Sequence, residues 1–345
     1  AGRLVPCGWY PTVGVVGAAL GGGFGPFGRR FGLACDHVVA ADVVLASGEA
    51  VRAAPDLLWA LRGAGGGQLA VVTALTLRTR PAPPSTWFAV TWRYEHAADV
   101  LDAWQHWAPR APRTLNAELV LAQGPDPATV PIAVVFGVTQ GGPAVLDRLV
   151  ADVGAPPWRR LVTPMSGPDA ARHRAYAGAP AATLPAVGRD LREPPGCRVL
   201  RSHLVGRPLP RAVVEDVVAS LPADRMPGQY REIEFVPWGG ALAEPRTDTA
   251  FAHRDACFLV EHNADVAPGA TAPQRDAVAR WVTRCWSTLL PWATGGVYPN
   301  YPDPALADPL RAYHGANLER LVEIKTAYDP DDVFRHAQSV PPLPR

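Results

Sequence analysis

The chain has 345 residues, of which 48% are hydrophobic and 19% are charged, a balance typical of a folded protein with about two domains. With 33 basic and 32 acidic residues its formal net charge is +1, which gives no global attraction to nucleic acid or to an anionic membrane. No run of ~18 apolar residues is free of charge, proline or glycine clusters, and no apolar leader is visible. We therefore expect no membrane span and a cytoplasmic location.

The cysteines and histidines form no recognisable metal site. The five cysteines are widely spaced, include no CxxC pair, and are odd in number. Neither a disulfide framework nor a zinc ribbon fits this pattern, and no HExxH motif occurs. We expect no bound metal.

Residues 1–82 alternate short strands and glycine turns. We predict strands over residues 39–45, 49–52 and 70–78, with a helix over 56–62. The proline-rich stretch 81–84 then marks a domain boundary.

Longer units follow this boundary. We predict strands over residues 87–94, 115–122, 131–138, 198–205, 229–236 and 256–262, and helices over 98–107, 144–153, 210–220 and 271–290. The segment 155–197 is rich in proline, glycine and arginine and is expected to wrap the surface. Near the C-terminus we expect a strand or turn at 295–301, a helix over 304–313, and a helix over 317–328 with Asn317 as its N-cap.

Three stretches carry candidate chemistry. Residues 12–25 (TVGVVGAALGGGFG) are dense in glycine, which allows positive φ and a close backbone approach to an anion or a planar cofactor. Tight turns at a sheet edge would produce the same pattern. Residues 63–73 form a second glycine cluster, which a helix C-cap also explains. Residues 298–301 (YPNY) could face a cofactor, or could contain a buried tyrosine bonded to a backbone carbonyl.

Together these stretches resemble the berberine-bridge-enzyme-like branch of the FAD-linked oxidases. The resemblance rests on the glycine loop, on residues 31–37 (FGLACDH) and 56–73, on the PWGG element at 237–240, and most specifically on residues 298–342. It implies an α+β fold. Residues 1–82 would be a remnant of the FAD-binding domain, and 83–290 a substrate-binding domain with an antiparallel sheet as one wall. Residues 291–345 would return to the FAD domain.

The resemblance also implies FAD as cofactor. The positions that match its FAD contacts are Gly14, Gly17, Gly21, Gly22, Gly23, Gly32, Val71, Tyr298 and Asn300. Tyr10 and Ala18 stand where the family has its flavin-linking cysteine and the loop histidine, so any FAD is expected to be non-covalent. The family's pyrophosphate loop has no counterpart here. We therefore expect weak or no FAD binding by this chain alone, and either self-association or a separate chain that supplies the missing half-domain.

Two residues match family positions for a general base. Tyr298 is the favoured candidate, and Glu261 is the second. A carboxylate within an apolar strand should have a raised pKa, which suits a base, although Glu261 could equally lie at an exposed strand end. Strand alternation directs His262 to the opposite face. Trp238 replaces a tyrosine of the family and could stack on a substrate.

The resemblance implies oxidation of an alcohol, a sugar or an alicyclic C–H of a small metabolite, with O2 as acceptor. The alternative is a truncated or degenerate member that binds no flavin and does not catalyse alone. The sequence does not name the substrate, because fold does not determine function.

Overall fold

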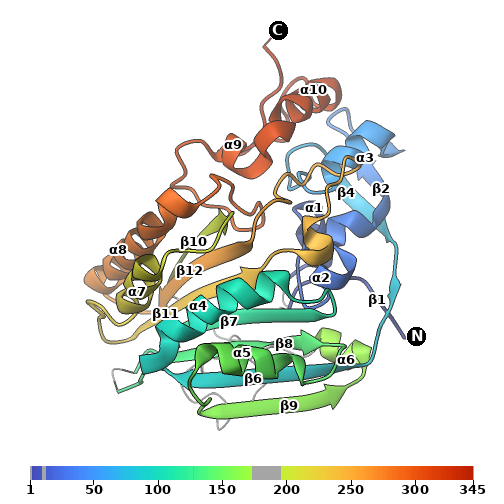
Figure 1. The fold of residues 1–345 in the computed structure, drawn as a ribbon. Helices are drawn as coiled ribbons and strands as arrows, with labels where there is room; N and C mark the ends of the chain where they lie inside the picture. Colours follow the sequence, from blue (N-terminus) through green and yellow to red (C-terminus); the bar gives the residue numbers. More distant parts are fainter. Residues whose placement is uncertain (1, 10–12, 127, 173–195, 345) are drawn as a thin grey trace.

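A large antiparallel sheet dominates the computed structural model, which describes residues 2–9, 13–126, 128–172 and 196–344 (Figure 1). Among these residues, seven strands pair in the order β10-β12-β11-β7-β8-β6-β9. Their bounds are β6 (Ser85–Arg93), β7 (Leu115–Gln123), β8 (Ile132–Thr139), β9 (Arg159–Met165), β10 (Cys197–Val205), β11 (Gln229–Pro237) and β12 (Phe258–Val266).

Helices cover one face of this sheet. They are α4 (Ala97–Trp107), α5 (Val145–Val153), α7 (Arg211–Ser220) and α8 (Ala272–Leu289). Phe235 and Phe258 point to this side, where both pack edge-on against Trp104 of α4 in the main core. Because side chains alternate along a strand, the residues next to these phenylalanines face the other side of the sheet.

A smaller layer contains the N-terminal part of the chain. The strands β2 (Val38–Val44), β3 (Ala50–Arg52) and β4 (Val71–Leu77) form an antiparallel sheet in the order β3-β2-β4. The helices α1 (Val15–Leu20), α2 (Gly28–Phe31) and α3 (Pro55–Leu61) belong to this part, and the short strands β1 (Arg3–Leu4) and β5 (Arg80–Pro81) pair beside it. A short helix α6 (Gly167–Arg172) follows β9, and 3-10 turns occur at 34–37, 94–96, 108–110, 240–243, 290–292 and 315–317.

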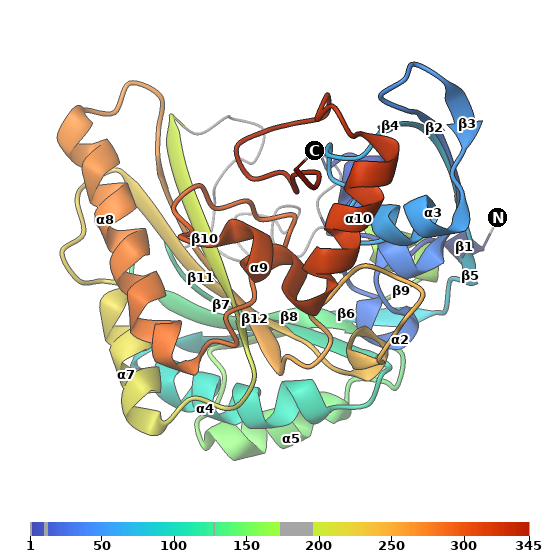
Figure 2. The same ribbon diagram turned by 90° about the horizontal axis from the view of Figure 1, so that it is seen from above.

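The C-terminal segment returns to the N-terminal layer. Figure 2 shows α9 (Pro309–His314) and α10 (Leu318–Tyr328) on the opposite side of the large sheet from α4 and α5. The buried ammonium of Lys325 donates to the carboxylate of Asp329 at 2.6 Å and to the backbone carbonyl of Gln68 at 3.0 Å. A buried charge is tolerated only when it is paired in this way. The lysine therefore fixes α10 against the segment that leads into β4.

Most predicted elements are present within a few residues of their expected bounds, with three differences. The strand β9 lies in the segment 155–197, where we expected surface wrapping, and residues 173–195 of that segment lie outside the described part. Residues 295–301 contain turns and no strand, which is one of the two predicted alternatives. The helix α9 begins only at Pro309, because Asp308 caps it by accepting a hydrogen bond from the backbone N–H of Arg311. Asn317 does not cap α10 with its side chain, which donates instead to the carbonyl of Ala250.

No helix within the described residues combines the length and the apolar character that crossing a membrane requires.

Candidate active site

A cavity of about 630 Å³ lies where three distant segments meet. One wall is the N-terminal segment with the glycine-rich loop, and another is residues 298–302. Glu234 of β11 contributes from the large sheet. The cavity therefore combines backbone suited to close ligand approach with buried polar side chains.

Tyr298 and the glycine loop form one tightly packed unit. The backbone N–H of Gly23 donates to the Tyr298 hydroxyl at 2.7 Å, and Nδ2 of Asn300 donates to the same oxygen at 3.0 Å. Gly22 and Gly23 have φ values of 131° and 82°, which favour glycine. A Cβ on Gly22 would lie 3.0 Å from Cε2 of Tyr298. These two glycines are thus needed to place Tyr298.

The hydroxyl of Tyr298 is buried beside other aromatic rings. Phe24 and Tyr301 each lie 5.1 Å from its ring centroid. Burial raises the pKa of Tyr298 to about 12, although the hydrogen bonds from Gly23 and Asn300 act in the opposite direction. The residue is therefore a neutral phenol near pH 7, and the two donors would stabilise negative charge on its oxygen.

Carboxyl groups gather on the sheet face that looks toward the cavity. Glu234 of β11 lies directly opposite Glu261 of β12 in the strand register. Oxygens of these two residues and of Glu232 lie within 4.8 Å of one another, and all three side chains are buried. Burial and the nearby Glu232 raise the pKa of Glu261 to about 7, while Arg198 and a hydrogen bond from Tyr301 lower it. The carboxyl group of Glu261 therefore gains or loses its proton near neutral pH.

Two further carboxyl contacts extend this cluster. The hydroxyl of Tyr230 donates to Glu232 on the same strand. On β7, Oε1 of Glu118 accepts from Nε1 of Trp9 at 2.7 Å and from Nδ2 of Asn116 at 2.8 Å. Trp9 also lines the cavity, so it connects the N-terminal segment to the sheet.

His262 lies on the helix-covered face, as the strand alternation predicts. Its ring meets that of His203 at 5.7 Å between centroids, and His203 stacks on Trp286 of α8. Glu261 and His262 therefore cannot act on the same ligand.

The predicted cofactor contacts fall into two groups. Gly14, Gly17, Gly23, Tyr298 and Asn300 line the cavity. The other four positions do not belong to its described lining. Gly21 packs on Asn300, and Gly22 packs on Tyr298. Gly32 ends α2 against Asp36, and Val71 is 52% exposed on β4. Tyr10 lies outside the described residues.

Trp238 lies behind the cavity wall. It is fully buried, and its Nε1 donates to the carbonyl of His253 at 2.9 Å. Its ring packs against Phe251 and Tyr298. In this arrangement the tryptophan supports Tyr298 from behind, and it does not present its ring to a ligand in the cavity.

The sequence interpretation did not include Glu234, Glu118 or Trp9. A signal for Glu234 exists, because Glu232 and Glu234 alternate along one strand that ends at the PWGG element. Glu118 and Trp9 are 109 residues apart, and no local pattern predicts their hydrogen bond.

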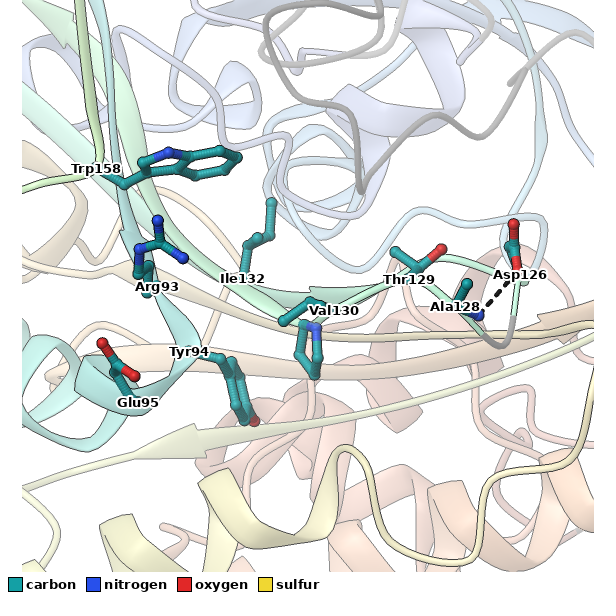
Figure 3. Close-up of a pocket in the computed structure, with 10 residues that line it drawn as sticks. Arg93, Tyr94, Glu95, Asp126, Ala128, Thr129, Val130, Ile132 and Trp158 are labelled. Atoms are coloured by element: carbon teal, nitrogen blue, oxygen red, sulfur yellow. Dashed lines mark hydrogen bonds between the residues drawn. The ribbon is translucent and has the colours of Figure 1, made fainter.

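A second cavity of about 510 Å³ lies at the end of β6 and β8 (Figure 3). Its lining includes Arg93, Val130 and Trp158, and the last two are 70% and 51% exposed. None of the predicted site residues contributes to it. The cavity at Tyr298 is therefore the better candidate for chemistry.

Two family models match the two ends of the chain. Residues 297–341 match the family model "Berberine and berberine like", and residues 1–54 match "FAD binding domain". An uncharacterized FAD-linked oxidoreductase of Bacillus subtilis, YvdP, is 31% identical over 99% of this chain and 74% of its own length. Berberine bridge enzyme-like 24 of Arabidopsis thaliana is 28% identical over 98% of this chain and 67% of its own.

Solved structures show the same fold. BBE-like 28 of Arabidopsis thaliana has a TM-score of 0.83 and 25% identity, and the match covers 99% of this chain and 74% of that one. The glucose dehydrogenase Phl p 4.0202 has a TM-score of 0.80 and 27% identity, with coverage of 99% and 73%. The fold and the cavity define an FAD-dependent oxidoreductase of α+β architecture. Within that class, the chain belongs to the berberine bridge enzyme-like family of FAD-linked oxidases.

The residues of the cavity fit FAD, the cofactor of this family. A Cβ added to Gly14 or Gly17 would meet no atom within 4 Å, so the loop there leaves open space beside the cavity. Ala18 carries no side-chain donor or nucleophile. The Cys7 thiol also lines the cavity, and burial raises its pKa to about 11, which keeps it protonated.

Proposed function

We propose that the protein oxidises a hydroxyl-bearing carbon of a small neutral molecule, such as an alcohol or a sugar, with O2 as the final acceptor. The observation that carries this proposal is the single cavity that brings together the glycine loop, Tyr298 and Glu234, with the ionisable Glu261 across the strand from Glu234. Oxidation of an alcohol requires removal of a proton and a hydride, and such a site supplies proton-handling groups beside a flavin.

The relatives support a hydroxyl-bearing substrate and the choice of O2. Phl p 4.0202 is a glucose dehydrogenase, and a variant of Phl p 4 with 28% identity to this chain is a glucose oxidase. The same scaffold thus supports sugar oxidation with either type of acceptor. The alternative reaction, which the resemblance also implies, is oxidation of an alicyclic C–H.

The chain's own residues would act as follows. Gly14, Gly17 and Gly23 would let the backbone approach FAD, which supplies hydride acceptance when bound. Tyr298 would take the substrate's proton in its phenolate form. The donors Gly23 N–H and Asn300 Nδ2 would stabilise this form before the transfer, which leaves a neutral phenol. Glu261 would determine the pH dependence, because its pKa lies near 7.

We also propose that FAD is held without a covalent bond and that the protein is cytoplasmic. Ala18 cannot form a histidyl link, and the protonated Cys7 is a poor nucleophile. All five cysteines are free, which suits a reducing compartment.

The direct test is anaerobic mixing of the purified, FAD-loaded protein with a panel of sugars and alcohols. We expect bleaching of the oxidised flavin absorbance by at least one of them and recovery of the colour when O2 is admitted. Bleaching by none of the panel would refute the substrate class. Bleaching that O2 does not reverse would refute O2 as acceptor and leave the oxidation step intact.

A further inference from the structure

The carboxyl cluster contains one oxygen that lacks a donor. Glu118 is 1% exposed, and its Oε1 accepts two short hydrogen bonds, from Trp9 and from Asn116. Its Oε2 is buried and accepts no hydrogen bond from any amide, indole or hydroxyl group of the described residues. An unsatisfied buried carboxylate oxygen is costly, so a donor is expected nearby.

Glu234 is placed to be that donor. In the register Glu234 pairs with Val120 on β7, two residues from Glu118 and on the same face, so the two carboxyl groups are diagonal neighbours. On its other side Glu234 faces Glu261 directly. Like charges in opposed positions repel, so at least one of the three carboxyl groups must carry a proton.

We propose that Glu118 is a positioning residue. It accepts a hydrogen bond from a protonated Glu234 and so keeps the carboxyl group of Glu234, which lines the cavity, neutral. The proton stays on Glu234 because Trp9 and Asn116 stabilise the charged form of Glu118. A neutral Glu234 leaves Glu261 as the carboxyl group that ionises beside the cavity. This role in catalysis rests on the proposed acid–base function of the site.

The pKa directions agree with this assignment. Burial raises the pKa of Glu234 well above its usual value, and the charges of Glu118, Glu261 and Glu232 and the hydrogen bond to Glu118 raise it further. Burial also raises the pKa of Glu118, but the hydrogen bonds from Trp9, Asn116 and Glu234 oppose this. The titratable and charged groups around Glu234 are Glu118 on β7, Glu232 on its own strand, Glu261 on β12, Arg198 on β10, and Cys7, Tyr298 and Tyr301 across the cavity.

Infrared difference spectroscopy of the purified full-length protein tests the proton directly, whether or not FAD is bound. We expect wild type to show a C=O band of a protonated carboxylic acid that persists above the pKa of Glu261, which is about 7, and we expect Glu234→Gln to lack this persistent band. In Glu118→Gln the band should titrate ~1 pH unit lower or more, since Glu234 loses both a hydrogen-bond acceptor and a negative neighbour. In Trp9→Phe it should titrate higher, because ionised Glu118 loses a donor. Glu215→Gln, an exposed change on α7, is the control and should leave the band unchanged.

The pH at which the band titrates should move in opposite directions in Glu118→Gln and Trp9→Phe. Opposite shifts distinguish a proton held on Glu234 from a general effect of the substitutions on packing. A band that persists above the pKa of Glu261 in Glu234→Gln would overturn the proposal, as would an unmoved or upward titration of this band in Glu118→Gln. Circular dichroism of each variant checks that it is folded, and Trp9→Phe supplies a second route should Glu118→Gln not fold. In the FAD-loaded enzyme the acid limb of the pH–rate profile should also move to lower pH in Glu118→Gln. The infrared result stands even if the substrate class proposed above is wrong.

Discussion

The backbone N–H of Gly23 donates a 2.7 Å hydrogen bond to the phenolic oxygen of Tyr298, which lies 275 positions further along the chain. This bond joins the glycine loop to the C-terminal segment at the cavity. It places Tyr298, which lies in the segment that most specifically resembles the family, against the backbone that would face the cofactor. The geometry and stability of the site therefore depend on the glycine as well as on the tyrosine.

We expect Gly23→Ala to lower the free energy of unfolding by about 1–3 kcal/mol. The residue has a φ of 82°, and the new Cβ would lie 2.6 Å from Cβ of Ala34. The matched control is Gly14→Ala, at a φ of −64° and with nothing within 4 Å of the new Cβ. It should change the stability by no more than about 0.5 kcal/mol. Equal losses for both variants in chemical denaturation would contradict this account.

Tyr298→Phe and Glu261→Gln should affect flavin reduction in different ways. Removal of a general base typically lowers the rate by ~10²–10⁴, and we expect this loss for Tyr298→Phe in single-turnover reduction across neutral pH. Glu261→Gln should instead flatten the pH dependence near pH 7, because the pKa of Glu261 is about 7. If Glu261→Gln abolished reduction while Tyr298→Phe stayed within roughly threefold, the two roles would be reversed.

Denaturation should release the flavin. The Cys7 thiol, with its pKa raised to about 11 by burial, is protonated near neutrality, so a thioether link is not expected. After acid precipitation the flavin fluorescence should remain in the supernatant. Flavin that stays with the wild-type polypeptide and is released from Cys7→Ala would show that Cys7 forms a covalent link.

His262 should make the fold sensitive to acid. The ring is fully buried, neither of its nitrogens has a partner within the described part of the chain, and burial lowers its pKa well below the usual value. The unfolded state, with a pKa of ~6.5, binds the proton more readily, so the free energy of unfolding should fall as the pH drops below about 6.5.

His262→Phe should remove part of this acid dependence. The remaining slope would include His203, whose pKa burial lowers to about 4. The control is His106→Gln, whose side chain is 51% exposed and should leave the slope unchanged. Denaturant titrations between pH 7 and about pH 4 measure both variants. An identical slope in wild type and His262→Phe would show that the ring is not the titrating group.

Local patterns predicted much of the fold. The alternation of apolar residues located most strands of the large sheet, and helical spacing located α4, α5, α7 and α8. The strand β9 was missed because its segment is rich in arginine and proline and its side chains are largely exposed, which resembles a loop. Asn317 was assigned a capping role that the fold overrides, since its side chain bonds to the carbonyl of Ala250 instead.

The sequence by itself determined the family, the glycine loop and the candidates Tyr298 and Glu261, because each lies within a short motif. Only the tertiary structure decided that Trp238 lies behind the cavity, that Glu234 lines it, and that Trp9 and Glu118 meet. The physical reason is that a motif specifies the backbone over a few residues, whereas burial and hydrogen bonding depend on segments that pairing of distant strands brings together. The ionisation of the site depends on those long-range contacts, since the carboxyl groups that raise one another's pKa come from three strands.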